Sequence, residues 1–476
     1  MVRIYNTLSR SLEEFEPVVA GKVGIYTCGP TVYRDVHIGN FRTYLTTDIL
    51  VRLFKYKEYD VKSVMNITDV GHFRYSAEKN KVIDPVIEEA NLLGVTPLEL
   101  SRRYTEKFIS DSKKLNILPP DNLPKASEHI DEMIEVIQVL IDKGYAYESR
   151  SAGSTSSPRA SSGQADGNIY FSVEKFKDYG KLSGNTLDKA EALLEAVRVS
   201  RETDKKDSAD FALWKSQEDR IMSFKSPWGQ GVPGWHIECS VMSMKYLGIT
   251  FDIHLGGEDL IFPHHEDEIA QSEAFSGRKF SNYFMHTSYL LVDEEKMSRS
   301  KNNIYTLNDL NNRDFSAMDF KYLTYQTHYR SYMNFTWDAL KSSRTAYLKL
   351  LDFMSKIPNS GEISDKYEAK FMDAVEKDLN MPKALAVLWE LIRSSEPESK
   401  KYGTIKLFDG ILGLKIIENS KKIIDVPDEV KQMAVDRDKL RAKKKYLLAD
   451  QIRYKIEKKG YIVEDMEKGS RVLKRI

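Results

Sequence analysis

Residues 22–54, KVGIYTCGPTVYRDVHIGNFRTYLTTDILVRLF, contain the pattern that decides the fold. The apolar and aromatic run at 22–27 predicts a buried strand, which the turn residues CGP end. From Gly39 onward apolar side chains recur at helical spacing, and residues 61–68, VKSVMNIT, resemble a second strand. A strand, a glycine-bearing loop, a helix and a second strand form a βαβ unit, which is the nucleotide-binding half of a doubly wound α/β fold.

The rest of the chain extends this pattern. Helical periodicity dominates residues 86–147, and FDIHLGG at 251–257 reads as a strand that runs into a glycine turn. A helix is predicted from Pro263 through Ala274, and the C-terminal third is helical in pattern. We therefore expect a Rossmann-type doubly wound parallel-sheet catalytic domain, split by an insertion and followed by a mostly α-helical C-terminal region.

Composition indicates a soluble, cytoplasmic chain of several domains. Its 476 residues exceed what one hydrophobic core usually serves. Lys and Arg number 71, as do Asp and Glu, so a polyanionic partner must be met by local patches. Basic residues outnumber acidic ones about two to one beyond Asp436. We expect neither a signal peptide nor a membrane span. The Ser/Gly-rich segment 150–167 predicts a flexible loop, with a strand resuming after it.

The only two cysteines, Cys28 and Cys239, indicate a metal site that is closed by folding. His264 and Glu268 are four residues apart on the predicted helix and can project from one face. His265 is also close enough to Glu268, and spacing does not choose between the two histidines. The alternative is a pair of buried, reduced cysteines together with a solvated acidic helix face.

Two short motifs indicate a nucleotide site. HIGN at 37–40 lies where the first strand's loop enters the helix, so a phosphate could approach the backbone there. KMSRSKNN at 296–303 is a basic, hydroxyl-rich loop suited to a triphosphate. Each motif by itself is better explained as an ordinary surface turn. Their order, with a large insertion between them, favours nucleotide binding.

Longer stretches resemble one family. HIGN is similar to the HIGH signature of class I aminoacyl-tRNA synthetases, and KMSRS at 296–300 to their KMSKS loop. Stretches that resemble cysteinyl-tRNA synthetases in particular are YTCGPTVY at 26–33, NITDV at 66–70, PGWHIECS at 233–240 and FDIHLGGEDLIFPHHEDEIAQSEA at 251–274. DLNMPKA at 378–384 resembles the family's helical domain, and ADQIR at 449–453 its anticodon-reading region. The likeness covers nearly the whole chain.

The resemblance implies that L-cysteine is activated by ATP with Mg²⁺ and passed to the terminal ribose of tRNA(Cys). It implies one zinc ion per chain, bound by Cys28, Cys239, His264 and Glu268. A substrate thiolate can join zinc as a ligand far better than a serine hydroxyl can. Such a readout could supply specificity without proofreading. We expect a monomer with no membrane partner.

The resemblance also assigns residues and domains. The residues expected to bind ATP or act in catalysis are His37, Gly39, Asn40, Lys296, Ser298 and Arg299. Those expected to border the amino acid are Gly29, Thr31, Thr68, Trp235 and His254, although packing roles explain each one about as well. The expected parts are catalytic halves at 1–115 and 226–290, a connective insertion at 116–225, a KMSKS-like loop and stem-contact region at 291–345, a helical bundle at 346–422 and an anticodon-binding region at 423–476.

Three departures and two rival functions accompany this interpretation. Asn40 replaces the second histidine of HIGH, Arg299 replaces the second lysine of KMSKS, and the residues after Asp69 differ from the acidic continuation of many members.

A ligase that joins cysteine to a small amine would share the motifs but has little use for a long basic tail. A non-catalytic, zinc-dependent nucleic-acid-binding protein would not need the paired nucleotide motifs.

Overall fold

The computed structural model describes residues 1–70, 74–76, 81–83, 85–149, 167–185, 204–216, 222–298, 301–423, 426–465 and 469–474. These residues divide into two compact units. The first comprises Met1–Leu307, His328–Asn334 and Glu376–Asn380, and the second comprises Asn308–Thr327, Phe335–Val375 and Met381–Ile476. Within the described part, no helix has both the length and the apolar character needed to cross a membrane.

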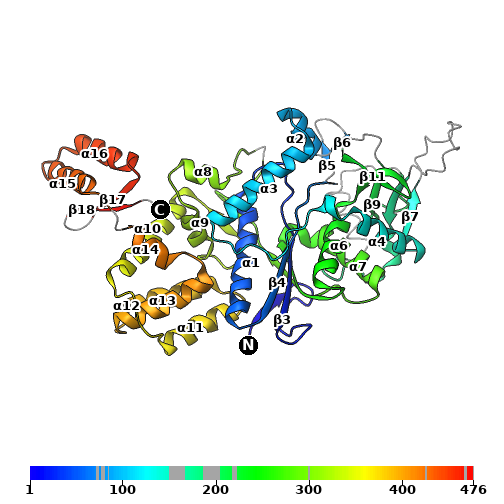
Figure 1. The fold of residues 1–476 in the computed structure, drawn as a ribbon, viewed down its shortest axis with the longest axis horizontal. Coiled ribbons are helices and arrows are strands. Elements are labelled where there is room, and N and C mark those ends of the chain that lie inside the picture. The colour runs from blue at the N-terminus through cyan, green and yellow to red at the C-terminus, as the bar shows by residue number, and fades with distance from the viewer. Residues whose placement is uncertain are drawn as a thin grey trace. The chain divides into compact units, whose positions relative to one another are not determined.

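A four-stranded parallel sheet forms the centre of the first unit (Figure 1), in the order β13 (Ser281–Thr287), β12 (Phe251–Gly257), β3 (Lys22–Thr27), β4 (Asp60–Met65). Ile25 of β3 lies opposite Ile253 of β12, and both are fully buried, as expected for a parallel strand covered on both faces. Helix α1 (Ile38–Tyr56) packs against the sheet. The predicted βαβ unit and the Rossmann-type class are confirmed.

The insertion folds as a separate antiparallel sheet. Its order is β10 (Phe224–Ser226), β11 (Gly229–Pro233), β9 (Phe211–Ser216), β8 (Asn168–Phe171), β7 (Ala146–Ser149). Helix α4 (Ile130–Asp142) packs on β7, and the rings of Phe171 and Phe211 stack with centroids 4.9 Å apart. Ser149 pairs with Asn168, so the Ser/Gly-rich segment does join two strands. Of that segment, residues 150–166 lie outside the described residues.

The remaining elements of the first unit surround these sheets. They are β1 (Arg3–Asn6), β2 (Ser11–Glu14), β5 (Arg74–Ser76), β6 (Lys81–Ile83), α2 (Pro85–Leu93), α3 (Pro97–Lys114), η1 (Ala126–Glu128), η2 (Val173–Lys175), α6 (Trp235–Leu247), η4 (Glu258–Leu260), η5 (Ile261–His265), α7 (Glu266–Ser276), β14 (Leu290–Val292) and β15 (Glu295–Lys296). A short strand, β16 (Met333–Phe335), lies at the junction between the units along the chain.

The second unit is mostly helical, as predicted. Its helices are α8 (Leu307–Asn312), α9 (Ala317–Thr324), α10 (Trp337–Lys356), α11 (Asp365–Glu376), α12 (Met381–Arg393), α13 (Glu398–Leu412), α14 (Ile416–Ile423), α15 (Asp428–Ala442) and α16 (Tyr446–Lys458). Ser316 and Asp319 form a capping box that begins α9. The rings of Phe371 and Phe408 stack 3.9 Å apart between α11 and α13. A hairpin, β17 (Tyr461–Asp465) with β18 (Ser470–Lys474), was not predicted.

One predicted helix begins later than expected. The sequence predicts a helix from Pro263, but α7 begins at Glu266. Phe262 has an extended backbone (φ −140°, ψ 130°), and the Phe262–Pro263 peptide bond is cis. A residue that precedes proline is biased away from the helical region, which accounts for the extended Phe262, while Pro263–His265 complete the helical turn η5 that runs into α7. His264 therefore lies in the turn before α7, while Glu268 lies in its first turn.

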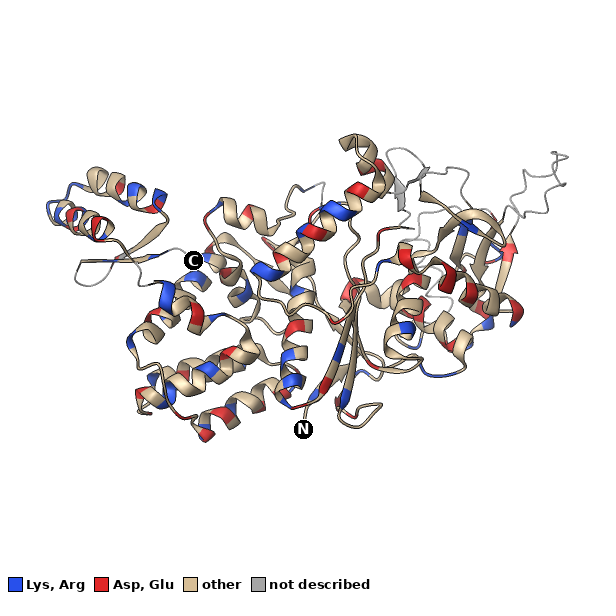
Figure 2. Cartoon of the chain, in the orientation of Figure 1, with Lys and Arg blue, Asp and Glu red and all other residues tan. Residues whose placement is uncertain are grey.

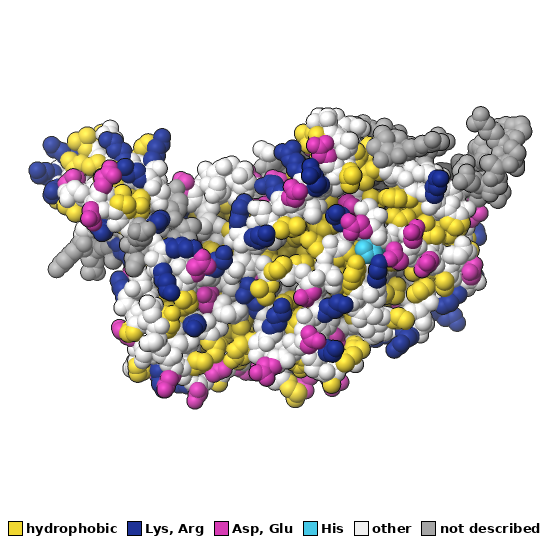
Figure 3. Space-filling view, viewed as in Figure 1, with side chains coloured by type: hydrophobic (Ala, Val, Ile, Leu, Met, Phe, Trp, Pro, Cys, Tyr) yellow, Lys and Arg dark blue, Asp and Glu magenta, His cyan; other side chains and the backbone are white. Residues whose placement is uncertain are grey.

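Charges of both signs occur on the face of the molecule that is drawn in Figure 3. The face drawn in Figure 3 shows acidic and basic side chains interspersed among apolar ones, in keeping with the formal net charge of +0. Figure 2 shows several Lys and Arg residues on α15 and α16, the region in which the sequence becomes basic.

Candidate active site

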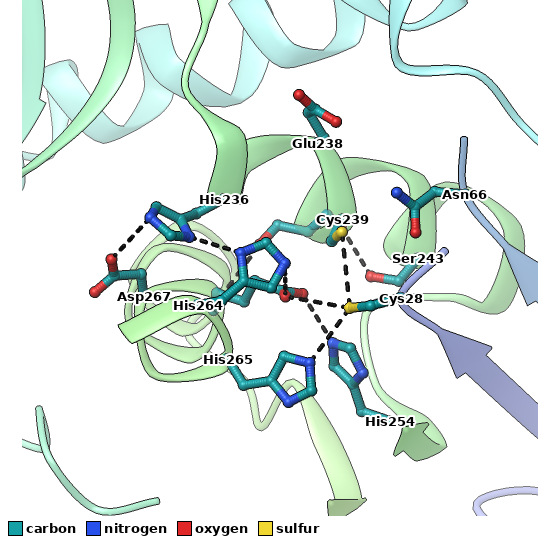
Figure 4. A network of polar contacts seen from close by, with 12 residues as sticks. Cys28, Asn66, His236, Glu238, Cys239, Ser243, His254, His264, His265 and Asp267 are labelled. Atoms are coloured by element: carbon teal, nitrogen blue, oxygen red, sulfur yellow. Dashed lines mark hydrogen bonds and ion pairs between the residues drawn. The ribbon is translucent and has the colours of Figure 1, made fainter. Parts of the chain in front are cut away.

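Side chains from three distant parts of the chain meet in a buried cluster of four residues (Figure 4). Cys28 follows β3, Cys239 lies on α6, His264 lies in the turn before α7, and Glu268 lies on α7. One ligand atom from each lies within 4.8 Å of every other, and all four residues are buried. The structure therefore brings together all four predicted metal ligands.

The spacing of these atoms fits one tetrahedral ion. The Sγ atoms of Cys28 and Cys239 are 3.9 Å apart, too far for a disulfide. Two sulfurs bound to one zinc at ~2.3 Å would be about 3.8 Å apart. His264 Nε2 lies 3.0 Å from Glu268 Oε1. Burial raises the pKa of both Cys28 and Cys239, so these thiols stay protonated unless a cation compensates their charge.

A second group of potential ligands overlaps the first. Cys28, His254, His265 and Glu268 also meet the distance requirement. His265 Nε2 is 3.3 Å from Cys28 Sγ, and His254 Nε2 is 2.8 Å from Glu268 Oε2. Distances alone leave the choice between His264 and His265 open, as spacing in the sequence did.

The contacts behind the two histidines differ. His264 Nδ1 shares a 2.8 Å hydrogen bond with His236 Nδ1, and His236 Nε2 lies 3.2 Å from Asp267 Oδ2. This histidine-to-carboxylate chain is the arrangement that orients a metal-binding imidazole. His265 Nδ1 instead shares a hydrogen bond with His286 Nε2, at 2.8 Å, and no carboxylate within the described residues hydrogen-bonds to that pair. The carboxylate favours His264 as the ligand.

The cluster opens into a cavity of about 360 Å³ at the carboxyl ends of the parallel strands. Ligands of open α/β sheets bind at this edge. The predicted residues that line the cavity are Cys28, Gly29, Thr31, His37, Gly39, Asn40, Thr68, Trp235, Cys239, His264 and Lys296. Ser298, His254 and Glu268 are not among the lining residues, and Arg299 lies outside the described residues.

Residues of the two nucleotide motifs lie next to each other at the N-terminus of α1. The amide of Ile38 donates to the Tyr305 carbonyl at 2.9 Å. A Cβ added to Gly39 would collide with the Cε methyl of Met297, so the end of that side chain would have to move. The expectation that HIGN and KMSRS form one site is supported by this contact.

His37 caps helix α1 and has a defined tautomer. Its Nδ1 accepts from the Asn40 amide at 3.2 Å, which leaves Nε2 to carry the proton. Burial, together with the nearby Arg34, lowers the pKa of His37 to about 4. At neutral pH this side chain is therefore an uncharged hydrogen-bond donor in the cavity wall.

Lys296 and Ser298 have different surroundings. Lys296 lies in the cavity wall, with its Nζ 4.1 Å from the centre of the Tyr289 ring. The amide of Ser298 donates to Asn303 Oδ1 at 2.8 Å, which folds the loop back on itself. Tyr289 was missed by the sequence interpretation, because nothing in its local pattern distinguishes it from a packing residue.

Of the predicted amino-acid-binding residues, four line the cavity and His254 does not; the four are Gly29, Thr31, Thr68 and Trp235. The Gly29 amide donates to Asn66 Oδ1 at 2.8 Å, and Thr68 Oγ1 donates to Glu238 Oε2 at 2.9 Å. Trp235 stacks on the His264 ring with centroids 4.1 Å apart. The side chain of His254 is fully buried and contacts Glu268. Asn66 and Glu238 were not predicted, although both lie within the quoted motifs NITDV and PGWHIECS.

A parallel nucleotide-type sheet with a cavity at its carboxyl edge, lined by residues of HIGN and by Lys296 and Met297 of KMSRS, is the arrangement of a class I aminoacyl-tRNA synthetase catalytic domain. Residues 14–345 match the family model described as "tRNA synthetases class I (C) catalytic domain". The chain also resembles the crystal structure of Mycobacterium tuberculosis methionyl-tRNA synthetase bound by methionyl-adenylate. The TM-score is 0.54 at 14% identity, over 84% of this chain and 93% of that one, which shows a shared fold.

Curated relatives narrow the assignment. The chain is 40% identical to cysteine–tRNA ligase 1 of Burkholderia lata, over 98% of this chain and 96% of that one. It is 39% identical to the cysteine–tRNA ligases of Caldicellulosiruptor saccharolyticus, with 99% of both chains covered, and of Thermus thermophilus, with 98% of both covered. The chain belongs to the cysteine–tRNA ligase family.

Proposed function

We propose that this chain activates L-cysteine with ATP to cysteinyl-adenylate, releases pyrophosphate, and transfers the cysteinyl group to the 3′-terminal ribose of tRNA(Cys). One observation carries the proposal: a thiol-rich, metal-capable cluster opens into the same cavity as the paired nucleotide motifs. Membership of the cysteine–tRNA ligase family supports the same reaction.

Cys28, Cys239, His264 and Glu268 are proposed to hold one zinc ion at the base of the cavity. Zinc bound there would supply a Lewis-acidic centre that prefers thiolate to hydroxyl oxygen. His236 and Asp267 hold the His264 ring in one tautomer through their hydrogen bonds. Trp235, stacked on that ring, forms part of the cavity wall.

The remaining predicted residues are proposed to receive the two substrates. The amino acid is bordered by Gly29, Thr31, Thr68 and Trp235. His254 lies on the buried side of these residues. His37, Gly39 and Asn40 meet the phosphates, while Lys296, Ser298 and Arg299 approach from the facing loop, with Mg²⁺ accompanying ATP.

Adenylate formation then needs no covalent nucleophile from the protein. The carboxylate oxygen of cysteine attacks the α-phosphorus, the bond to the bridging oxygen breaks, and pyrophosphate leaves. The His37 Nε2–H donates to phosphate oxygens without adding charge, and the N-terminus of α1 favours the negative charge beside it. Lys296 supplies positive charge to the leaving group.

Residues 423–476 are proposed to read the anticodon. Support comes from the basic sequence beyond Asp436 and from the exposed Tyr446 and Tyr454 of α16, since aromatic side chains between cations suit unstacked bases. For the rest of the chain, we propose the domain boundaries expected from the sequence, at 1–115, 116–225, 226–290, 291–345 and 346–422. We also propose that the protein is a monomer.

Two assays test the proposal. Cysteine-dependent exchange between ATP and pyrophosphate measures activation, and charging of tRNA(Cys) measures transfer. Both activities are expected. Exchange without transfer would favour a ligase for a small amine, and the absence of both would contradict an enzymatic function. Removal of residues beyond Ile423 is expected to weaken charging while exchange is retained; equal loss of both would mean that the tail holds the fold together.

A further inference from the structure

In one short turn that contacts residues of the cavity wall, every backbone carbonyl accepts a hydrogen bond. The residues are His328–Ser331, where the Ser331 amide donates to the His328 carbonyl at 2.9 Å. The carbonyls of His328 and Ser331 accept from Arg42 Nη2, at 2.9 and 2.6 Å. Those of Tyr329 and Arg330 accept from the amide and the hydroxyl of Ser288, both at 2.9 Å. We call these four residues the 328–331 turn.

Arg42 ties this turn to the cavity wall. It lies on α1 and is 2% exposed. Its Nη1 donates to the carbonyls of Ser288 and Tyr289, at 2.6 and 3.0 Å. Both of those residues line the cavity, and the Tyr289 ring lies against Lys296. A shift of the 328–331 turn must therefore displace Ser288 and Tyr289, or break these bonds.

Asp378 anchors the side chains of the same turn. Its Oδ1 accepts from the Tyr329 hydroxyl at 2.6 Å and from the Tyr5 amide at 2.9 Å. Its Oδ2 lies 2.6 Å from both Nε and Nη2 of Arg330, so one carboxylate oxygen accepts from both nitrogens of this ion pair. Burial and the Asp378 carboxylate raise the pKa of Tyr329 well above its usual value, so the phenol remains a donor.

The backbone at Asp378 is also unusual. Asp378 has φ +60° and Leu379 has φ +51°, both in the left-handed region that non-glycine residues rarely adopt. The Asp378 amide donates to the Arg3 carbonyl at 2.8 Å, which holds the segment Glu376–Asn380 within the first unit. A strained backbone retained at a buried, fully paired carboxylate indicates that its position matters.

We propose that Asp378, which does not line the cavity, is a positioning residue for the nucleotide: it fixes the 328–331 turn, and through Ser288 and Tyr289 it sets the place of Lys296. The inference rests on the proposed function, because it assumes that this cavity receives ATP. It assigns the DLN motif at 378–380 a role in substrate activation. Asp378 should then affect ATP and leave cysteine recognition at the metal cluster unchanged.

Asp378→Asn tests the proposal, because it keeps the shape of the side chain and removes its charge. In cysteine-dependent pyrophosphate exchange, the KM for ATP is expected to rise about ten-fold or more. The KM for cysteine and the bound metal content are expected to stay within about two-fold of the wild type. The matched control is Asp373→Asn, which removes an exposed ion pair with Lys383 and should change none of these quantities.

A milder variant covers the case in which Asp378→Asn does not fold. Tyr329→Phe removes one hydrogen bond to Asp378, and a smaller rise of the KM for ATP is expected. Calorimetric titration with ATP gives the Kd independently of turnover. Equal changes in the KM values for ATP and cysteine, or an unchanged Kd for ATP in a folded variant, would overturn the proposal. Wild-type protein that binds ATP but lacks exchange would contradict only the proposed function, and wild type that binds no ATP would overturn both.

Discussion

Cys28 and Cys239 are separated by 211 residues in the chain, and their sulfur atoms lie 3.9 Å apart. Cys28 follows the central strand β3, and its amide donates to the Leu255 carbonyl of β12 at 3.1 Å. This bond fixes the first sulfur at the carboxyl ends of the parallel strands. Helix α6 brings the second. The fold therefore holds the two sulfur atoms at the spacing that one shared metal ion requires.

The first prediction concerns this pair. Cys239→Ser replaces a soft thiolate with a weakly binding hydroxyl, so we expect loss of bound zinc and a KM for cysteine at least about ten-fold higher. Elemental analysis of the purified protein and pyrophosphate exchange measure the two effects. Lys245→Gln, on the exposed side of the same helix, is the control. Full zinc occupancy in Cys239→Ser would show that the ligand assignment is wrong.

The second prediction concerns the charge of His37. Because the pKa of His37 is about 4, this side chain stays neutral from pH 8 down to pH 5.5. We expect His37→Gln to lower kcat/KM for exchange about 10²-fold while the acid side of the pH profile keeps its shape. An ionisation near pH 6.5 that is present in the wild type and absent from the variant would contradict a neutral donor.

The third prediction concerns the contact between the two nucleotide motifs. Gly39→Ala places a methyl group against Met297 Cε and should push the KMSRS loop away from α1, so that the KM for ATP rises. Met297 is a flexible side chain, so the rise is expected to be moderate, about ten-fold. The double variant Gly39→Ala/Met297→Ala removes the clash and should recover much of the loss. If the changes in the KM for ATP caused by Gly39→Ala and by Met297→Ala simply add in the double variant, the contact does not couple the motifs.

The fourth prediction concerns stability in acid. Burial lowers the pKa of His286 to about 3, so the folded protein holds this ring neutral while the unfolded chain protonates it near pH 6.5. The stabilisation is present above that pH and is lost as pH falls, by about 1.4 kcal/mol per unit. Between pH 6.5 and 5, the free energy of unfolding of metal-free wild type should fall more steeply than that of His286→Gln, by about this amount. Urea denaturation measures both slopes, and parallel curves would argue against a buried neutral His286.

Regular elements with strong periodicity could be predicted from the sequence. The strands at 22–27 and 251–257 were placed at their observed bounds, because buried parallel strands are continuous apolar runs that end in glycine turns. The helix predicted from Pro263 through Ala274 is present, although its first three residues belong to the helical turn η5 and α7 itself begins at Glu266. Short strands such as β1 and the β17–β18 hairpin carry too few residues to show a pattern.

The site was predictable only in part, for a physical reason. Ligand types and spacing made Cys28, Cys239 and Glu268 possible ligands, and only the family resemblance chose His264. The contacts behind the His264 and His265 rings differ, and they are visible only in the folded chain. Arg42 was not found, because it binds backbone carbonyls, which every residue has. Asp378 lay in a quoted motif, but its partners Tyr5, Tyr329 and Arg330 come together only in the folded chain.

The most direct test of the account is the visible absorption spectrum of protein in which cobalt(II) replaces zinc. A site with two cysteine ligands should give intense sulfur-to-cobalt bands, and these should change when L-cysteine is added but not when L-serine is added. Such a difference would tie the cluster of Cys28, Cys239, His264 and Glu268 to recognition of the substrate thiol. A spectrum that lacks thiolate bands, or one that responds equally to cysteine and serine, would contradict that claim.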